Sequence, residues 1–118
     1  MSNNLPSLLF VDAMVGATAY TPSQHEAADV QLSAAAMEHV RCAQVDIYCS
    51  HNSHAMWEIR EARRALRATA IGGVAETLVA LDEAAWFTRH NDFLHAEEAL
   101  ETALEHMRAM SGRQVRPS

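Results

Sequence analysis

The sequence has no lysine, little glycine and proline, and few aromatic residues. All nine basic residues are arginine, and glycine and proline together supply seven of 118 residues. This composition excludes collagen-like and low-complexity chains, and two cysteines are too few for a disulfide scaffold. No apolar run reaches the roughly 18 residues that a membrane-spanning helix needs. The length therefore points to one globular domain, with or without an arm.

Alanine and acidic residues are abundant instead. The chain contains 22 alanines, and alanine loses no side-chain entropy on entering a helix. We therefore expect an all-α protein with a slim core, because most of its apolar side chains are small. Fifteen acidic residues against nine basic ones give a net charge of −6, which disfavours general binding to nucleic acids.

The cysteines and the N-terminal segment indicate the cellular compartment of the protein. Cys42 and Cys49 are seven positions apart, about 10 Å along one helix, which is too far for a disulfide. The apolar residues 8–11 and the small residues 17–19 weakly resemble a signal peptide, but no arginine precedes them and Asp12 interrupts them. We therefore expect reduced thiols and a cytoplasmic protein without a membrane segment.

Helix start and stop signals divide the chain into three parts. Residues 1–20 form an apolar N-terminal arm, residues 21–112 a helical bundle, and residues 113–118 a loose tail. Within the bundle, helices are expected over about 21–48, 54–70, 74–89 and from 93 to a stop at Ser111-Gly112. Amphipathic helices joined by short connections predict an antiparallel four-helix bundle.

Each expected helix carries an inner apolar stripe at three-four spacing. Thr21 and Pro22 provide the first start signal, and Gly72-Gly73 the stop of the second helix. The expected inner residues are Leu32, Ala36, Val40, Ala43 and Ile47; Ala55, Ile59, Ala62, Leu66 and Ala70; Val74, Leu78, Leu81 and Ala85, with Trp86 and Phe87 at the helix end; and Phe93, Ala96, Leu100, Ala103, Leu104, Met107 and Met110.

The second expected helix has the most informative surface. Trp57, Arg60, Arg64 and Arg67 recur at spacings of three, four and three, so they share one side of the helix, with Arg63 beside them. Guanidinium groups bind carboxylates and phosphates through forked hydrogen bonds and stack on tryptophan. These four residues, called here the arginine face, are therefore the candidate partner-binding residues.

Three partners for the arginine face remain open. The fourth expected helix offers a matching set of acids, called here the acid face: Glu97, Glu98, Glu101 and Glu105. The first interpretation is that the two faces pair, either within the bundle or between two copies. Pairing between copies would make the protein a homo-oligomer, which we expect. An acidic protein partner is the second, and a phosphorylated ligand is the third.

The histidines raise the question of a metal. Cys49, His51 and His54 lie within six residues, and thiolate with imidazole is a zinc-type ligand set. Their spacing matches no strong zinc signature, and a break between two helices also accounts for polar residues at these positions. We therefore predict no metal or cofactor, and these three residues are the candidates if a metal is bound. His39 and His106 each follow a glutamate and are expected to face solvent.

The motifs of several enzyme classes are missing. The sequence contains no nucleophile elbow, phosphate-binding loop or dinucleotide fingerprint. Serines lie near histidines only in sequence, which does not make a catalytic arrangement. We therefore expect no catalytic residues and a non-catalytic interaction or regulatory domain.

A series of residues from the second to the fourth expected helix resembles the sequence pattern of a known family. It comprises RRALRATA at residues 63–70, Gly72-Gly73, Leu78, Leu81, and Asn91-Asp92 at a turn. This order resembles that of histidine-phosphotransfer domains, the small four-helix bundles of two-component signalling. The resemblance covers residues 62–107, under half of the chain, and implies a signalling module as an alternative function.

The run departs from that family at the functional positions. Arg64 stands where the phosphorylated histidine would be, Arg67 replaces the lysine, and Ala68 replaces the glycine that lets a partner approach. Arginine does not accept and pass on a phosphoryl group as imidazole does. The resemblance therefore implies a module that docks a signalling partner without relaying phosphate from this position.

Overall fold

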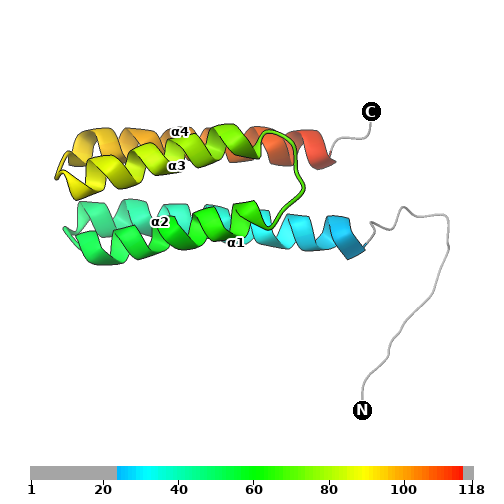
Figure 1. Ribbon diagram of the computed structural model, residues 1–118, viewed down its shortest axis with the longest axis horizontal. Coiled ribbons are helices and arrows are strands. Elements are labelled where there is room, and N and C mark those ends of the chain that lie inside the picture. The colour runs from blue at the N-terminus through cyan, green and yellow to red at the C-terminus, as the bar shows by residue number, and fades with distance from the viewer. Residues whose placement is uncertain (1–23, 116–118) are drawn as a thin grey trace, which may run out of the picture.

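The computed structural model describes residues 24–115, with side chains for residues 24 and 26–110. The described chain forms α1 (Gln24–Tyr48), α2 (Asn52–Arg67), α3 (Val74–Arg89) and α4 (Phe93–Val115), without strands (Figure 1). The all-α four-helix bundle expected from the sequence is thus confirmed. The predicted N-terminal arm and the start signal at Thr21 lie outside the described residues.

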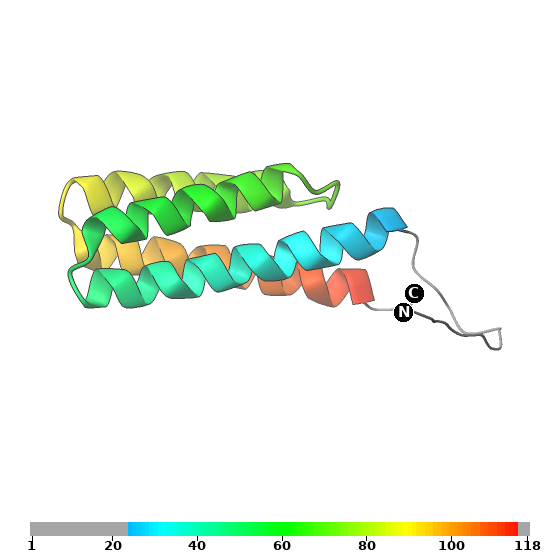
Figure 2. The ribbon, with the colours of Figure 1, turned by 90° about the horizontal axis from the view of Figure 1, so that it is seen from below.

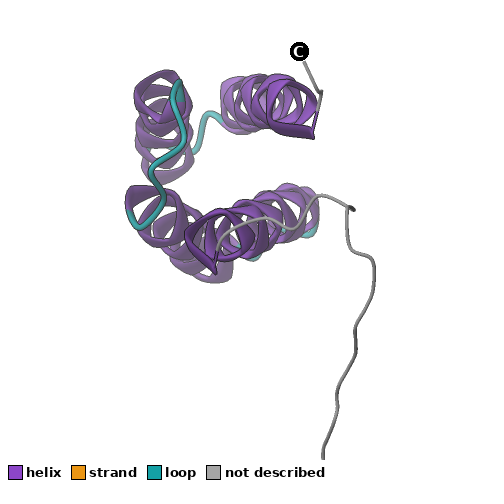
Figure 3. Cartoon of the chain, turned by 90° about the vertical axis from the view of Figure 1, so that its right-hand side faces the viewer, coloured by secondary structure: helices purple, strands orange, loops and turns teal. Residues whose placement is uncertain are grey.

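The bundle is built from two helical hairpins. α1 packs mainly on α2, and α3 mainly on α4, while α1 also contacts α4 and α2 contacts α3. Figure 2 shows the α1–α2 hairpin in front of the α3–α4 hairpin. Viewed along the bundle, α2 and α4 lie at opposite corners (Figure 3). The outer sides of α2 and α4 therefore point away from each other.

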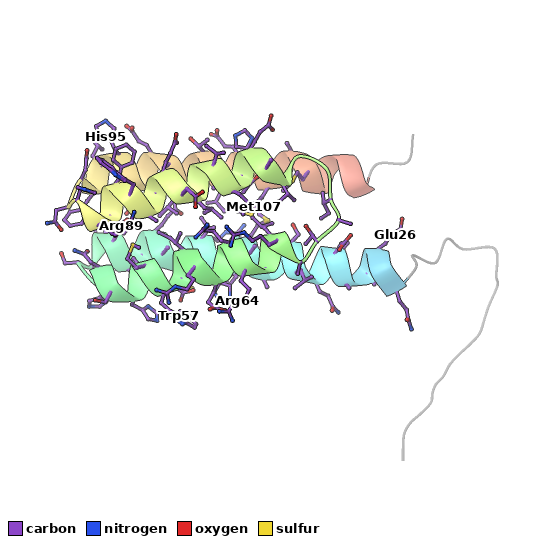
Figure 4. All side chains as sticks on the ribbon, viewed as in Figure 1. Glu26, Trp57, Arg64, Arg89, His95 and Met107 are labelled. Carbon is purple, nitrogen blue, oxygen red and sulfur yellow. The ribbon has the colours of Figure 1, made fainter. Side chains whose placement is uncertain are left out.

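The core between the hairpins is slim, as the composition predicts. Ten of the nineteen buried apolar residues are alanine, so the helices approach closely. The larger side chains at the centre come from every helix: Val40, Ile59, Leu66, Leu81, Leu100, Leu104, Met107 and Met110. Met107 lies between the two layers in Figure 4. The expected stripes of α1, α2 and α4 are buried for the most part, although Ala70 is exposed.

The buried side of α3 differs from the expected stripe. Thr77 and Thr88 are buried, whereas Val74 and Leu78 are only half-buried and Trp86 is 50% exposed. Thr88 Oγ1 donates a hydrogen bond to the Ala84 carbonyl oxygen at 2.7 Å. A threonine whose hydroxyl donates a hydrogen bond to a carbonyl oxygen of its own helix can pack in the core much as valine does. The expected stripe left out both threonines and was therefore rotated away from the observed buried side of α3.

The helix ends agree with the sequence in part. Breaks fall at the expected connections, and α3 has the expected bounds. α2 ends at Arg67 rather than residue 70, because the Thr69 hydroxyl bonds the Leu66 carbonyl oxygen at 2.8 Å and competes with continued helix. α4 continues to Val115, past the expected stop at Ser111-Gly112, since one glycine costs a helix only about 1 kcal/mol.

Candidate functional site

The arginine face lies on the outer side of α2. Trp57 is 44% exposed, the Arg64 side chain is 73% exposed, and Arg60 and Arg67 are exposed as well. Figure 4 shows Trp57 and Arg64 on the side of α2 that points away from α3 and α4. The spacing of these four residues thus predicted their shared surface correctly.

Arg63 does not belong to this face. Its side chain turns toward α3, where Nε lies 2.8 Å from Oδ1 of Asp82. The contact is an ion pair without hydrogen-bond geometry, since Nε has no hydrogen-bond partner. Arg63 therefore links the two hairpins electrostatically, while its neighbours remain at the surface.

The arginine face has little internal compensation. Arg64 lies 3.8 Å from Glu61 one turn away, and because the Arg64 side chain is 73% exposed this pair contributes little to stability. Arg60 and Arg67 form no ion pair with any side chain that the structure describes. Within the described residues, most of this positive charge is therefore left available to another molecule.

The acid face of α4 does not meet the arginine face within one chain. Glu101 accepts a hydrogen bond from Gln44 of α1 at 3.2 Å and lies 3.4 Å from Arg108 of α4 itself. Glu98 and Glu105 are exposed, and burial raises the pKa of Glu97 above its ordinary value of 4.5. Because α2 and α4 occupy opposite corners, pairing of the two faces inside the bundle is wrong.

A second polar group lies in the groove between α1 and α2. It consists of His39 and Asp46 from α1 with His54 and Glu58 from α2, and is called here the histidine–carboxylate cluster. His39 Nδ1 lies 2.5 Å from Glu58 Oε1, and His54 Nδ1 lies 2.6 Å from Asp46 Oδ2. His54 Nε2 is 3.8 Å from Glu58 Oε2, so one imidazole faces both carboxylates.

The two carboxylates of this cluster are largely removed from solvent. The Glu58 side chain is 7% exposed and that of Asp46 is 13% exposed, whereas His54 is 58% exposed. Trp57 stacks on His54, with ring centroids 5.7 Å apart, and meets His39 edge-on at 5.9 Å. The tryptophan therefore belongs both to the arginine face and to the wall of the cluster.

An open pocket of about 270 Å³ adjoins the cluster. Besides Asp46, His54 and Glu58, it is lined by Glu38, Arg41, Cys42 and Val45. Burial and the neighbouring carboxylates, Glu58 foremost, raise the pKa of the Cys42 thiol above 9.0. Cys42 is therefore a protonated, weakly reactive thiol at neutral pH.

The structure separates the three residues that the sequence indicates as candidates if a metal is bound. His54 lies in the cluster, and His51 Nδ1 is 4.0 Å from Asp46 Oδ1 at its edge, but Cys49 is exposed and outside it. His39, expected to face solvent, is bonded to Glu58 instead. The signal that could have found the cluster was the four-residue spacing of His54 and Glu58 on one side of a helix.

A smaller aromatic group covers the turn between α3 and α4. Trp86 stacks on His90 with centroids 3.9 Å apart, and Phe87 stacks on His95 at 5.2 Å. His95 Nδ1 lies 2.8 Å from Asp92 Oδ2. This pair resembles His54–Asp46 in chemistry, yet no third ligand group accompanies it among the described side chains.

No protein-family model and no curated protein match this chain. None of the helices within residues 24–115 has the length and apolarity needed to cross a lipid bilayer.

Proposed function

We propose that this protein is a non-catalytic helical interaction domain that self-associates through its arginine face. One observation carries the proposal: the chain presents a positive and a negative face on helices at opposite corners and pairs neither with the other. A second copy supplies the missing complement to each face.

The two faces match in length. Arg60 and Arg67 are seven residues apart on α2, about 10 Å along the axis, and Glu97 and Glu105 are eight apart on α4, about 12 Å. Three arginines can therefore lie opposite three glutamates at nearly the same spacing. Trp57 adds aromatic area, and tryptophan and arginine are enriched at protein interfaces.

The slim core supports association on energetic grounds. Burial at an interface adds to the limited apolar area that alanine-rich helices remove from water. Since the two faces point in different directions, the contact is heterologous. Repetition of that contact forms a closed ring if the rotation between neighbouring copies divides a full turn, and an open filament if it does not.

Light scattering coupled to size-exclusion chromatography tests the proposal. At low salt the full chain should have a mass above the 13.0 kDa of one copy, and 1 M salt, with a Debye length of about 3 Å, should reduce it. The triple variant Arg60→Gln, Arg64→Gln and Arg67→Gln should be monomeric at both salt concentrations.

A charge-matched variant provides the control. Arg41→Gln and Arg89→Gln together remove two charges from outside both faces and should leave the assembly intact, whereas Arg60→Gln and Arg67→Gln together, with the same loss of charge, should weaken it. A charge-reversed Arg60, Arg64, Arg67→Glu variant should not associate with itself, but its intact acid face should still bind the arginine face of the wild-type chain. A wild-type chain of 13.0 kDa at low salt would overturn self-association.

A docking role is also what the phosphotransfer resemblance implies. The resemblance aligns the family's histidine position with Arg64, whose side chain is 73% exposed on the arginine face. The resemblance and the self-association proposal therefore direct a partner to the same surface. Relay through His54, the nearest upstream histidine, is chemically disfavoured. Asp46 and Glu58 flank its ring and would repel a phosphoryl group.

A further inference from the structure

The histidine–carboxylate cluster is the feature that the interaction function leaves unexplained. We propose that Asp46, His54 and Glu58 bind a divalent transition-metal ion of the zinc type across the α1–α2 hairpin. Each side chain offers one ligand atom, and these atoms lie within 4.8 Å of one another. The inference is independent of self-association.

The fold places the three ligands from both sides of the hairpin. His54 and Glu58 are four residues apart, so they lie on the same side of α2, and Asp46 faces them from α1. Zinc bonds nitrogen and oxygen ligands at about 2.0–2.2 Å, which puts neighbouring ligand atoms about 3–3.5 Å apart. The three ligand atoms, which lie within 4.8 Å of one another, are therefore close to that spacing.

The burial of the carboxylates gives the ion an electrostatic role. Carboxylates removed from water are unfavourable unless a positive charge compensates them. His39 and His54 supply positive charge here only when they are protonated, whereas a divalent ion supplies two charges. The ion needs the lone pair of one His54 ring nitrogen, so its binding replaces the present contact between His54 Nδ1 and Asp46 Oδ2.

The surroundings orient the ligands as an outer shell does in metal sites. His39 holds Oε1 of Glu58 at 2.5 Å, so Oε2 is the oxygen that faces His54. Trp57 stacks on the His54 ring at an interplanar angle of 17° and limits its rotation. His39 and Trp57 are therefore positioning residues. Three protein ligands in an open groove leave a further coordination position for solvent or an exogenous ligand.

Zinc binding to the full, untagged chain tests this site. After treatment with a chelator, the protein is titrated with Zn²⁺ in competition with a chromogenic chelator. We expect one ion per chain and at least a tenfold loss of affinity for Asp46→Asn, His54→Gln or Glu58→Gln. His39→Gln should lower the affinity by about 10–100-fold, the range for outer-shell partners.

Two control variants separate this site from general affinity for histidines and thiols. Cys49→Ser removes an exposed thiol close in sequence, and His95→Gln removes a histidine that pairs with Asp92 at 2.8 Å but lacks a third ligand. Both should bind zinc as the wild type does. The absence of stoichiometric binding, or equal losses in these controls, would overturn the proposal.

Nitrogen NMR of the histidine rings tests the site without any substitution. Addition of Zn²⁺ to the wild-type chain should shift the ring nitrogens of His54 strongly and those of His39 weakly, and leave His95 unchanged. An unchanged His54 signal in the presence of excess Zn²⁺ would also refute the site, even if a variant fails to fold.

Discussion

Replacing Thr77 by valine should stabilise the protein. Thr77 is 0% exposed, and its Oγ1 has no hydrogen-bond partner among the described residues. An unsatisfied buried hydroxyl costs about 1–3 kcal/mol relative to its hydration in the unfolded chain. Valine has nearly the same shape and helix propensity, so Thr77→Val removes this penalty without opening a cavity.

Thr88 provides a matched control on the same helix. It is 1% exposed, but its hydroxyl donates to the Ala84 carbonyl oxygen at 2.7 Å. Thr88→Val loses that hydrogen bond, whose net contribution is about 0.5–1.5 kcal/mol. We therefore expect Thr77→Val to raise the free energy of unfolding by about 1 kcal/mol and Thr88→Val to leave it unchanged or lower.

Thermal and urea unfolding followed by circular dichroism measure the difference. For a helical domain of about 90 residues, 1 kcal/mol corresponds to a Tm change of about 4–8 °C. The reasoning requires the two substitutions to differ, with Thr77→Val the more stable. Equal effects of both, or a loss of stability in Thr77→Val, would show that the hydroxyl of Thr77 is satisfied in solution.

Three further predictions concern the core, the thiols and pH. Leu100 is 0% exposed, so Leu100→Ala should lower the free energy of unfolding by about 2–5 kcal/mol. Leu94 is 68% exposed, so Leu94→Ala should change it by less than about 0.5 kcal/mol. Similar urea midpoints for the two variants would contradict the core assignment. Iodoacetamide at pH 8 should modify the exposed Cys49 before Cys42, because the raised pKa of the Cys42 thiol leaves little thiolate. Peptide mass spectrometry measures the two rates. Equal rates in the folded chain would refute this prediction, whereas equal rates in denaturant are expected. Because burial raises the pKa of Glu97 above 4.5, the ionised form weakens folding, and this effect disappears as pH falls below 4.5. Glu97→Gln should therefore stabilise the chain at pH 7 by less than about 0.5 kcal/mol, because the carboxyl group is partly exposed. This gain in the free energy of unfolding should vanish at pH 4. A gain that grows toward pH 4 would show that the pKa of Glu97 is not raised.

Local sequence signals predicted most of the helices because they act within one or two turns. Three-four spacing identified buried residues such as Ile59 and Leu104, and the residues around Ser50 and Asn91 marked turns, where both adopt positive φ. Thr77 shows where this reasoning fails. Its burial depends on which side of α3 meets the other helices, and hydropathy alone does not reveal that side.

The sites required more than local signals. The spacing of Trp57, Arg60, Arg64 and Arg67 predicted one surface because all four residues belong to one helix. The partner of Arg63 on α3 depends on how the hairpins stack, and spacing within α2 carries no information about it. Sequence proximity likewise pointed to Cys49 as a ligand, whereas Asp46 meets His54 only because the chain reverses between α1 and α2.

The sequence by itself determined the number of helices, the slim alanine core and the existence of an arginine face, since each depends on periodicity within a helix. Only the tertiary structure decided which charges meet. Packing placed α2 and α4 at opposite corners, which keeps the arginine and acid faces apart in one chain. The same packing brought His39 and Asp46 against His54 and Glu58, because the contacts of a groove depend on the relative rotation of two helices.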